Sequence, residues 1–131
     1  MSKFLVTQYH QEVEKLIQYG GSNKETAIKS AFQNLLNGYC KPKDYLLIPE
    51  LDYKTKTGKL VRPDGTVKDA VRLDYGYWEA KDKYDNLDRE IEKKFGLGYP
   101  DQNILFEDSQ TAVLINMATK LGVLICKMRL I

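Results

Sequence analysis

A change in hydrophobic periodicity near residue 40 constrains this chain more than any other feature. In the first 38 residues, apolar side chains recur every three or four positions, which is the period of an amphipathic helix. Gly20-Gly21 interrupts this pattern, Ser22 or Asn23 then provides an N-cap, and Gly38 ends it. Short apolar runs separated by turn residues follow, as expected for strands. The chain is therefore predicted to form helices that cover a sheet.

We expect strands at residues 45–49, 67–73, 77–81, 103–106 and 111–115, with a polar helix at 86–95. The segment from Lys54 to Lys59 is interpreted as a polar loop, and the Pro-Asp-Gly sequence at 63–65 as a turn. Turn residues around Asp74 join the strands on either side of it into a hairpin. This order predicts an α/β fold with a central mixed β-sheet flanked by helices.

The composition suits one globular domain over residues 1–131, with 43% hydrophobic and 29% charged residues. The net charge of +2 excludes a polybasic tail that coats nucleic acid, but it leaves room for a local basic patch. Cys40 and Cys126 lack metal-ligand spacing, so we expect buried thiols in a reducing compartment. No secretory signal opens the chain, and polar residues interrupt the apolar tail after Val113. We therefore expect a cytoplasmic protein without a membrane span.

Two carboxylates and a lysine come together in the predicted hairpin. Because side chains alternate faces in a strand, Glu79 and Lys81 point to the same side of the sheet. If the hairpin folds about Asp74, Asp69 lies opposite Glu79, with Cβ atoms about 5 Å apart. Asp64 and Asp74 are alternatives for the first carboxylate, but Asp64 falls in a predicted turn and Asp74 lies near the hairpin tip. The prediction therefore pairs Asp69 with Glu79.

Such a pair favours a divalent cation, because two adjacent carboxylates repel each other unless a cation lies between them. Hard oxygen ligands select Mg²⁺ or Mn²⁺ over zinc, and such an ion activates water and offsets charge on a phosphoryl oxygen. The predicted reaction class is phosphodiester hydrolysis, with Lys81 orienting the water or stabilising the transition state. The Glu-x-Lys pattern alone is not specific, since residues 92–94 repeat it on a polar helix and residues 52–54 have its looser Asp-x-Lys form. A half-buried hairpin with surface charges is the alternative.

A longer segment resembles a known superfamily. Residues 69–72 (Asp-Ala-Val-Arg) and 76–82 (Gly-Tyr-Trp-Glu-Ala-Lys-Asp) are similar to PD-(D/E)xK nucleases. More narrowly, they resemble the Mrr-like nuclease domain at the N-terminus of Type ISP restriction–modification enzymes. Segments 26–36, 87–94 and 98–114 also resemble elements of that domain. The resemblance covers residues 5–115 and implies a restriction-endonuclease-like core, with 116–131 as a divergent C-terminal tail.

The resemblance also implies roles for the residues of the hairpin. Asp69 and Glu79 would be metal ligands, the Ala80 carbonyl would be a third ligand, and Lys81 would be the catalytic lysine. Mg²⁺ would be the cofactor, with Mn²⁺ as a substitute, and double-stranded DNA would be the substrate. The expected function is that of a metal-dependent DNA endonuclease domain.

Other residues have two interpretations each. Glu25 corresponds to an accessory acid near the metal, or is a first-turn acid that stabilises the helix dipole. Gln110 corresponds to a polar position near the site, or is an ordinary loop residue. A basic loop would either contact DNA phosphates or be an ordinary solvated loop. It comprises Lys54, Lys56, Lys59 and Arg62.

The resembling enzymes continue into helicase-like and methyltransferase modules, which we expect as partners. Cleavage of both strands needs two sites, so we also expect a dimer or two converging molecules. No Walker-type phosphate loop and no methyltransferase motif occurs in these 131 residues, so translocation and sequence recognition are not expected from this chain. One alternative is a catalytically silent nuclease-fold domain that binds DNA or a protein partner. Another is an α/β domain that binds a small molecule or a protein and has no role with nucleic acid.

Overall fold

The computed structural model describes residues 2–20, 25–81, 86–108, 111–116 and 122–127. The predicted helices are present as α1 (Ser2–Gly20) and α2 (Glu25–Cys40), followed by a short 3-10 turn, η1 (Lys41–Lys43). α2 continues through Gly38, which was expected to end it. A Cβ at Gly38 would lie 2.8 Å from Leu5 Cδ2, so this glycine lets α1 approach α2 closely. Within the described residues, no helix combines the length and apolar character needed to cross a membrane.

Six strands form one sheet in the order β1-β4-β5-β6-β7-β8. Neighbouring strands are antiparallel except for β5 and β6, which are parallel and are connected through α3 (Leu87–Gly96). Asn86 caps α3 by accepting a hydrogen bond from the Arg89 N–H. The strands are β1 (Leu46–Pro49), β4 (Gly65–Lys68), β5 (Asp74–Ala80), β6 (Ile104–Glu107), β7 (Thr111–Asn116) and β8 (Gly122–Lys127). The mixed sheet agrees with the prediction, although β8 was not predicted.

A separate hairpin occupies the segment that was interpreted as a loop. It consists of β2 (Tyr53–Lys54) and β3 (Leu60–Val61), which are antiparallel. Its tip closes through a hydrogen bond from the Thr55 N–H to the Lys59 carbonyl (2.7 Å). Gly58 provides the positive φ of 86° that the turn requires.

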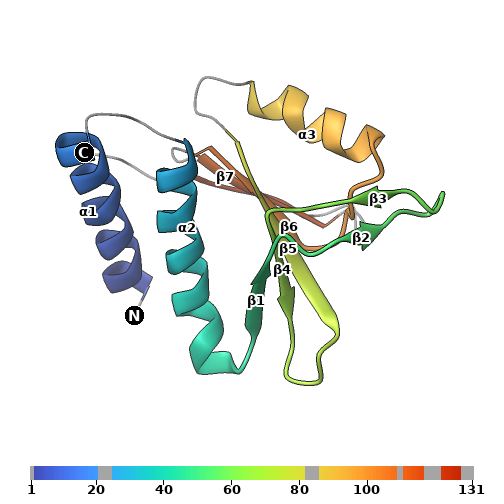
Figure 1. The fold of residues 1–131 in the computed structure, drawn as a ribbon, viewed down its shortest axis with the longest axis horizontal. Coiled ribbons are helices and arrows are strands. Elements are labelled where there is room, and N and C mark those ends of the chain that lie inside the picture. The colour runs from blue at the N-terminus through green and yellow to red at the C-terminus, as the bar shows by residue number, and fades with distance from the viewer. Residues whose placement is uncertain (1, 21–24, 82–85, 109–110, 117–121, 128–131) are drawn as a thin grey trace.

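Helices cover both faces of the sheet. Figure 1 shows α1 and α2 on one face, with α3 and the β2–β3 hairpin toward the other. Trp78 is 1% exposed and stacks on Phe32 of α2, with ring centroids 5.7 Å apart. On the α3 side, Ile91 packs in a second core with Ile104 and Phe106. Because strand residues alternate, the buried Trp78 directs its neighbour Glu79 to the α3 side.

Candidate active site

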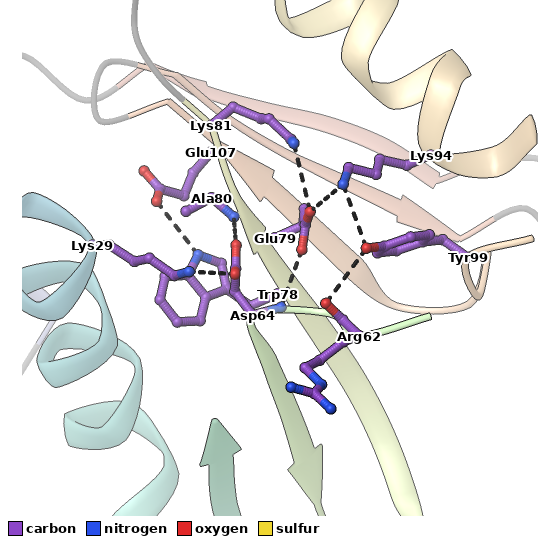
Figure 2. A network of polar contacts seen from close by, with 10 residues as sticks. All are labelled: Lys29, Arg62, Asp64, Trp78, Glu79, Ala80, Lys81, Lys94, Tyr99 and Glu107. Carbon is purple, nitrogen blue, oxygen red and sulfur yellow. Dashed lines mark hydrogen bonds and ion pairs between the residues drawn. The ribbon is translucent and has the colours of Figure 1, made fainter. Parts of the chain in front are cut away.

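The register between β4 and β5 decides which aspartate faces Glu79. Gly65 pairs with Trp78, so Asp64, one residue earlier, comes level with Glu79. The Asp64 N–H donates to Glu79 Oε1 (3.1 Å), and the Ala80 N–H donates to Asp64 Oδ2 (2.7 Å). Figure 2 shows both carboxylates at this end of the two strands. The structure therefore pairs Glu79 with Asp64.

The predicted pairing of Asp69 with Glu79 is wrong. β4 ends at Lys68, which pairs with Asp74, so the chain reverses over residues 69–73 and not around 74–76. Asp69 lies in this turn, where its Oδ1 accepts the backbone N–H groups of residues 71 and 73, each at 3.0 Å. The turn also places Arg72 at a left-handed φ of 71°. Asp69 thus lies near the start of β5, and Glu79 lies near the end of the same strand.

Three lysines from different elements surround the two carboxylates. Lys81 follows β5 directly and places its Nζ 3.6 Å from Glu79 Oε2, on the side that strand alternation predicted. Lys94 of α3 is closer, with its Nζ 2.9 Å from the same oxygen. Lys29 of α2 forms an ion pair with Asp64. Each acid therefore forms an ion pair with at least one lysine.

Burial determines the electrostatics of this cluster. Burial raises the pKa of Glu79, which is 4% exposed, and the charge of Asp64 raises it further, while Lys94 and Lys81 act in the opposite direction. Burial disfavours the charged form of Lys94, but the hydrogen bond and charge of Glu79 outweigh this effect and raise its pKa. Burial and the charge of Glu79 also raise the pKa of Tyr99, whose hydroxyl lies 3.4 Å from Lys94 Nζ. A buried carboxylate beside another acid is an environment that an added cation stabilises.

The oxygen atoms present suit Mg²⁺ or Mn²⁺. Within the described residues, no group of three or more acidic, histidine or cysteine side chains is placed to form a cage around an ion. Asp64 and Glu79 offer two carboxylates. In an antiparallel pair, the N–H and C=O of one residue point toward the same neighbouring strand. Because the Ala80 N–H donates to Asp64, the Ala80 carbonyl also points to the side of β5 on which Asp64 lies. Mg²⁺ typically takes one or two carboxylates and keeps several waters, so the residues fit this ion with Asp64 in place of Asp69.

Comparison with known proteins finds similarity to solved structures. No family model and no curated protein matches the chain. A cryo-EM structure of a DrdV–DNA complex matches with 41% sequence identity over 92% of this chain, at a TM-score of 0.85. The fold is restriction-endonuclease-like. Its mixed sheet, flanked by helices, confirms the expected fold class, and the chain spans 12% of the length of that DrdV chain.

Sequence reasoning did not select three residues of the cluster, although Asp64 was one of its alternatives for the first carboxylate. Asp64 carried a signal, because Pro63 precedes it and the pair matches the first letters of the superfamily motif. Lys94 carried one as well, since it lies three residues after Ile91 and so falls on the buried stripe of an otherwise polar helix. We find no comparable signal for Lys29, whose proximity to Asp64 depends on how α2 packs on the sheet.

The remaining predicted site residues are placed as follows. Glu25 is the first residue of α2, but its side chain lies outside the described part of the structure, and Gln110 lies outside it altogether. The four basic residues lie on or directly after the β2–β3 hairpin, where all are exposed: Lys54, Lys56, Lys59 and Arg62. Arg62 pairs with Asp52 at 2.9 Å.

Proposed function

We propose that this chain is a metal-dependent endonuclease domain that hydrolyses phosphodiester bonds in double-stranded DNA. The observation that carries the proposal is the pair of carboxylates at the ends of β4 and β5, where Asp64 donates its N–H to Glu79. Burial, and after it the charge of Asp64, raise the pKa of Glu79, and a cation held between the two acids would offset the repulsion between them. Similarity to a protein solved as a DrdV–DNA complex supports DNA as the substrate.

Each residue has its own task in this proposal. Asp64 and Glu79 would hold one Mg²⁺, or Mn²⁺ in its place, through carboxylate oxygens, and Ala80 would contribute its carbonyl. When bound, the ion lowers the pKa of water and offsets negative charge on the phosphoryl oxygen. Lys81 holds its ammonium beside Glu79, where it orients the attacking water and stabilises charge on the phosphate. Lys94 is a positioning residue, because it contacts Glu79 from α3.

The finer classification belongs to the same proposal. Pro63-Asp64 followed by Glu79-Ala80-Lys81 matches the PD-(D/E)xK motif, which supports a nuclease of that superfamily. The resemblance of segments 26–36, 87–94 and 98–114 supports the narrower assignment to an Mrr-like nuclease of the Type ISP kind. Since the chain spans 12% of the DrdV chain it matches, we propose that helicase-like and methyltransferase modules act with such a domain in a restriction–modification enzyme. Two copies of the site, from a dimer or from two converging molecules, would cut the two strands of the DNA. The expected location of this reaction is the cytoplasm.

Cleavage of supercoiled plasmid by the full chain tests this function, with Mg²⁺, Mn²⁺ or EDTA present. We expect metal-dependent nicking that falls by about 100-fold or more in Glu79→Gln and Lys81→Met. The second Glu-x-Lys sequence provides matched controls, because Glu92 and Lys93 are exposed on α3. Glu92→Gln and Lys93→Met should cleave within about twofold of wild type. Cleavage that persists in Glu79→Gln, or that needs no divalent ion, would contradict the proposal.

One observation favours a second candidate, a silent nuclease-fold domain that binds DNA or a protein without cutting. Lysines form ion pairs with both carboxylates, and such pairs compete with a metal ion for the same oxygen atoms. This candidate predicts no cleavage with any divalent ion, and DNA binding that is the same in EDTA and in Mn²⁺. The plasmid assay and a binding titration in the two buffers separate the candidates.

A further inference from the structure

We propose that the β2–β3 hairpin is a docking arm for the phosphate backbone of the duplex and sets the DNA onto the carboxylate pair. This inference rests on the proposed function, which it deepens by naming the surface that receives the substrate. The hairpin leads directly into Asp64, and it presents three exposed lysines: Lys54, Lys56 and Lys59. Figure 1 shows it extending from the sheet on the same side as α3, away from α1 and α2.

The tip of the hairpin is an ordered structure. The Thr55 N–H donates to the Lys59 carbonyl (2.7 Å), and the Lys59 N–H donates to Thr55 Oγ1 (3.1 Å). Thr55 is only 6% exposed, although it lies between charged and exposed neighbours. It lies against Gly98, where a Cβ would come within 2.7 Å of Thr55 Cγ2. The hairpin is thus seated on the segment that follows α3, and its lysines project from a defined position.

Two further contacts fix the base of the hairpin relative to the site. The Tyr53 ring packs edge-on against Tyr77 of β5, with centroids 5.6 Å apart. The Tyr99 hydroxyl donates to the Arg62 carbonyl (3.4 Å) and also lies 3.4 Å from Lys94 Nζ. Figure 2 shows this Tyr99 bridge between the incoming chain and the lysine that holds Glu79. The arm and the carboxylates therefore belong to one connected unit.

Charge on the arm is available to an external anion. Arg62 is paired with Asp52. Among the described residues, no ion pair involves any of the three lysines of the arm. Lysine is a flexible point charge, which suits contact with phosphates more than the reading of base edges. The arm is therefore suited to positioning DNA without regard to its sequence.

Chain geometry limits where these contacts fall on the duplex. Lys59 and Asp64 are five positions apart in the chain, so their Cα atoms are separated by at most ~18 Å when the chain is fully extended. Phosphates of one strand advance about 3.4 Å per base pair along the helix axis. The phosphates held by the arm should accordingly lie within roughly five base pairs of the phosphate that is cut.

The test measures binding of the full chain to a fluorescent 30-base-pair duplex in Ca²⁺ over a series of salt concentrations. One variant replaces the three lysines of the arm with glutamine. A control variant makes the same charge change at three exposed lysines on the opposite side of the fold: Lys15, Lys41 and Lys43. Loss of three phosphate contacts should reduce the slope of log K against log salt by about 2.7 and weaken binding at 0.1 M salt by roughly two orders of magnitude. The control slope should stay within about 0.5 of wild type.

Equal slopes in the arm variant and the control variant, with both variants folded by thermal melting, would overturn the docking arm. If wild type still cleaves plasmid in that case, the nuclease proposal stands and only the arm is refuted. If wild type binds no DNA in Ca²⁺, both proposals fall. Footprinting of wild type and the arm variant gives a second test. If the protection that the arm variant loses lies more than about ten base pairs from the nick, the arm is contradicted, since its reach is shorter.

Discussion

Replacing Lys94 with methionine removes the cation nearest Glu79 and keeps a side chain of similar length. Lys94 Nζ lies 2.9 Å from Glu79 Oε2, and the two side chains are 16% and 5% exposed. At an effective dielectric constant of about 20, unit charges at this distance attract by about 6 kcal/mol, of which desolvation cancels a large part. Lys81 remains 3.6 Å from the same oxygen, so the carboxylate keeps one cation. We expect the free energy of unfolding to fall by about 2–3 kcal/mol in EDTA, below the usual loss for a broken buried pair.

Denaturation by urea in EDTA and in saturating Mn²⁺ measures this effect. Lys94→Met also removes a charge that repels an incoming ion, so Mn²⁺ should bind at least about tenfold more tightly, which is about 1.4 kcal/mol. The ion should then recover much of the lost stability. Lys93→Met is the matched control, since Lys93 is exposed on α3 and its loss should cost less than about 0.5 kcal/mol.

Two results would refute the reasoning. If Lys94→Met and Lys93→Met are equally stable in EDTA, the contact between α3 and Glu79 contributes nothing to the fold. If Lys94→Met binds Mn²⁺ more weakly than wild type, then Lys94 assists ion binding and does not compete with it.

Three further predictions follow from the placement of single residues. Asp69→Ala loses two hydrogen bonds of the β4–β5 turn and should lower the free energy of unfolding by about 1–2 kcal/mol, while plasmid cleavage per folded molecule stays within about twofold. Because burial raises the pKa of Glu79, the native state keeps the carboxyl proton at a pH where the unfolded chain has lost it. In EDTA, the free energy of unfolding of wild type should therefore fall relative to that of Glu79→Gln as pH rises from about 4. A difference in stability between the two proteins that does not change with pH would contradict this. Gly98→Ala should destabilise the fold by about 1–3 kcal/mol more than Gly58→Ala, because both glycines have a positive φ but only at Gly98 would the added Cβ clash with Thr55. Equal melting temperatures of the two variants would show that the contact between Gly98 and Thr55 does not restrict position 98.

Periodicity predicted the elements because it is a local property of the chain. The helical stripes and apolar runs identified α1, α2, α3 and most strands of the large sheet. The register of β4 against β5 was missed because turn chemistry at residues 74–76 drew the predicted turn there. The chain instead reverses over residues 69–73, where Asp69 is the sole typical turn residue. Gly76 looked like a turn residue, yet it is buried in β5, where a Cβ would lie 2.8 Å from the Asn103 carbonyl oxygen. A glycine is needed here because the chain that enters β6 passes too close to leave room for a side chain. This is a requirement of the tertiary structure that the local sequence does not show.

The same distinction explains which parts of the candidate site were found. Glu79 and Lys81 were placed on one side because alternation along a single strand relates them. Asp64 depends on the register of two strands, and a shift in the turn moved the pairing by five residues from Asp69. Lys94 reaches the acids from another element, so only the packing of helices on the sheet brings it there.

Direct titration of Mn²⁺ into the full chain tests the central claim, that Asp64 and Glu79 hold one ion between them. Calorimetry or Mn²⁺ electron paramagnetic resonance should find one site per chain in wild type and in Asp69→Asn. Asp64→Asn keeps an acceptor for the Ala80 N–H but removes the charge, and it should weaken binding by about 100-fold or more. Unchanged binding in Asp64→Asn, or a loss confined to Asp69→Asn, would contradict the account.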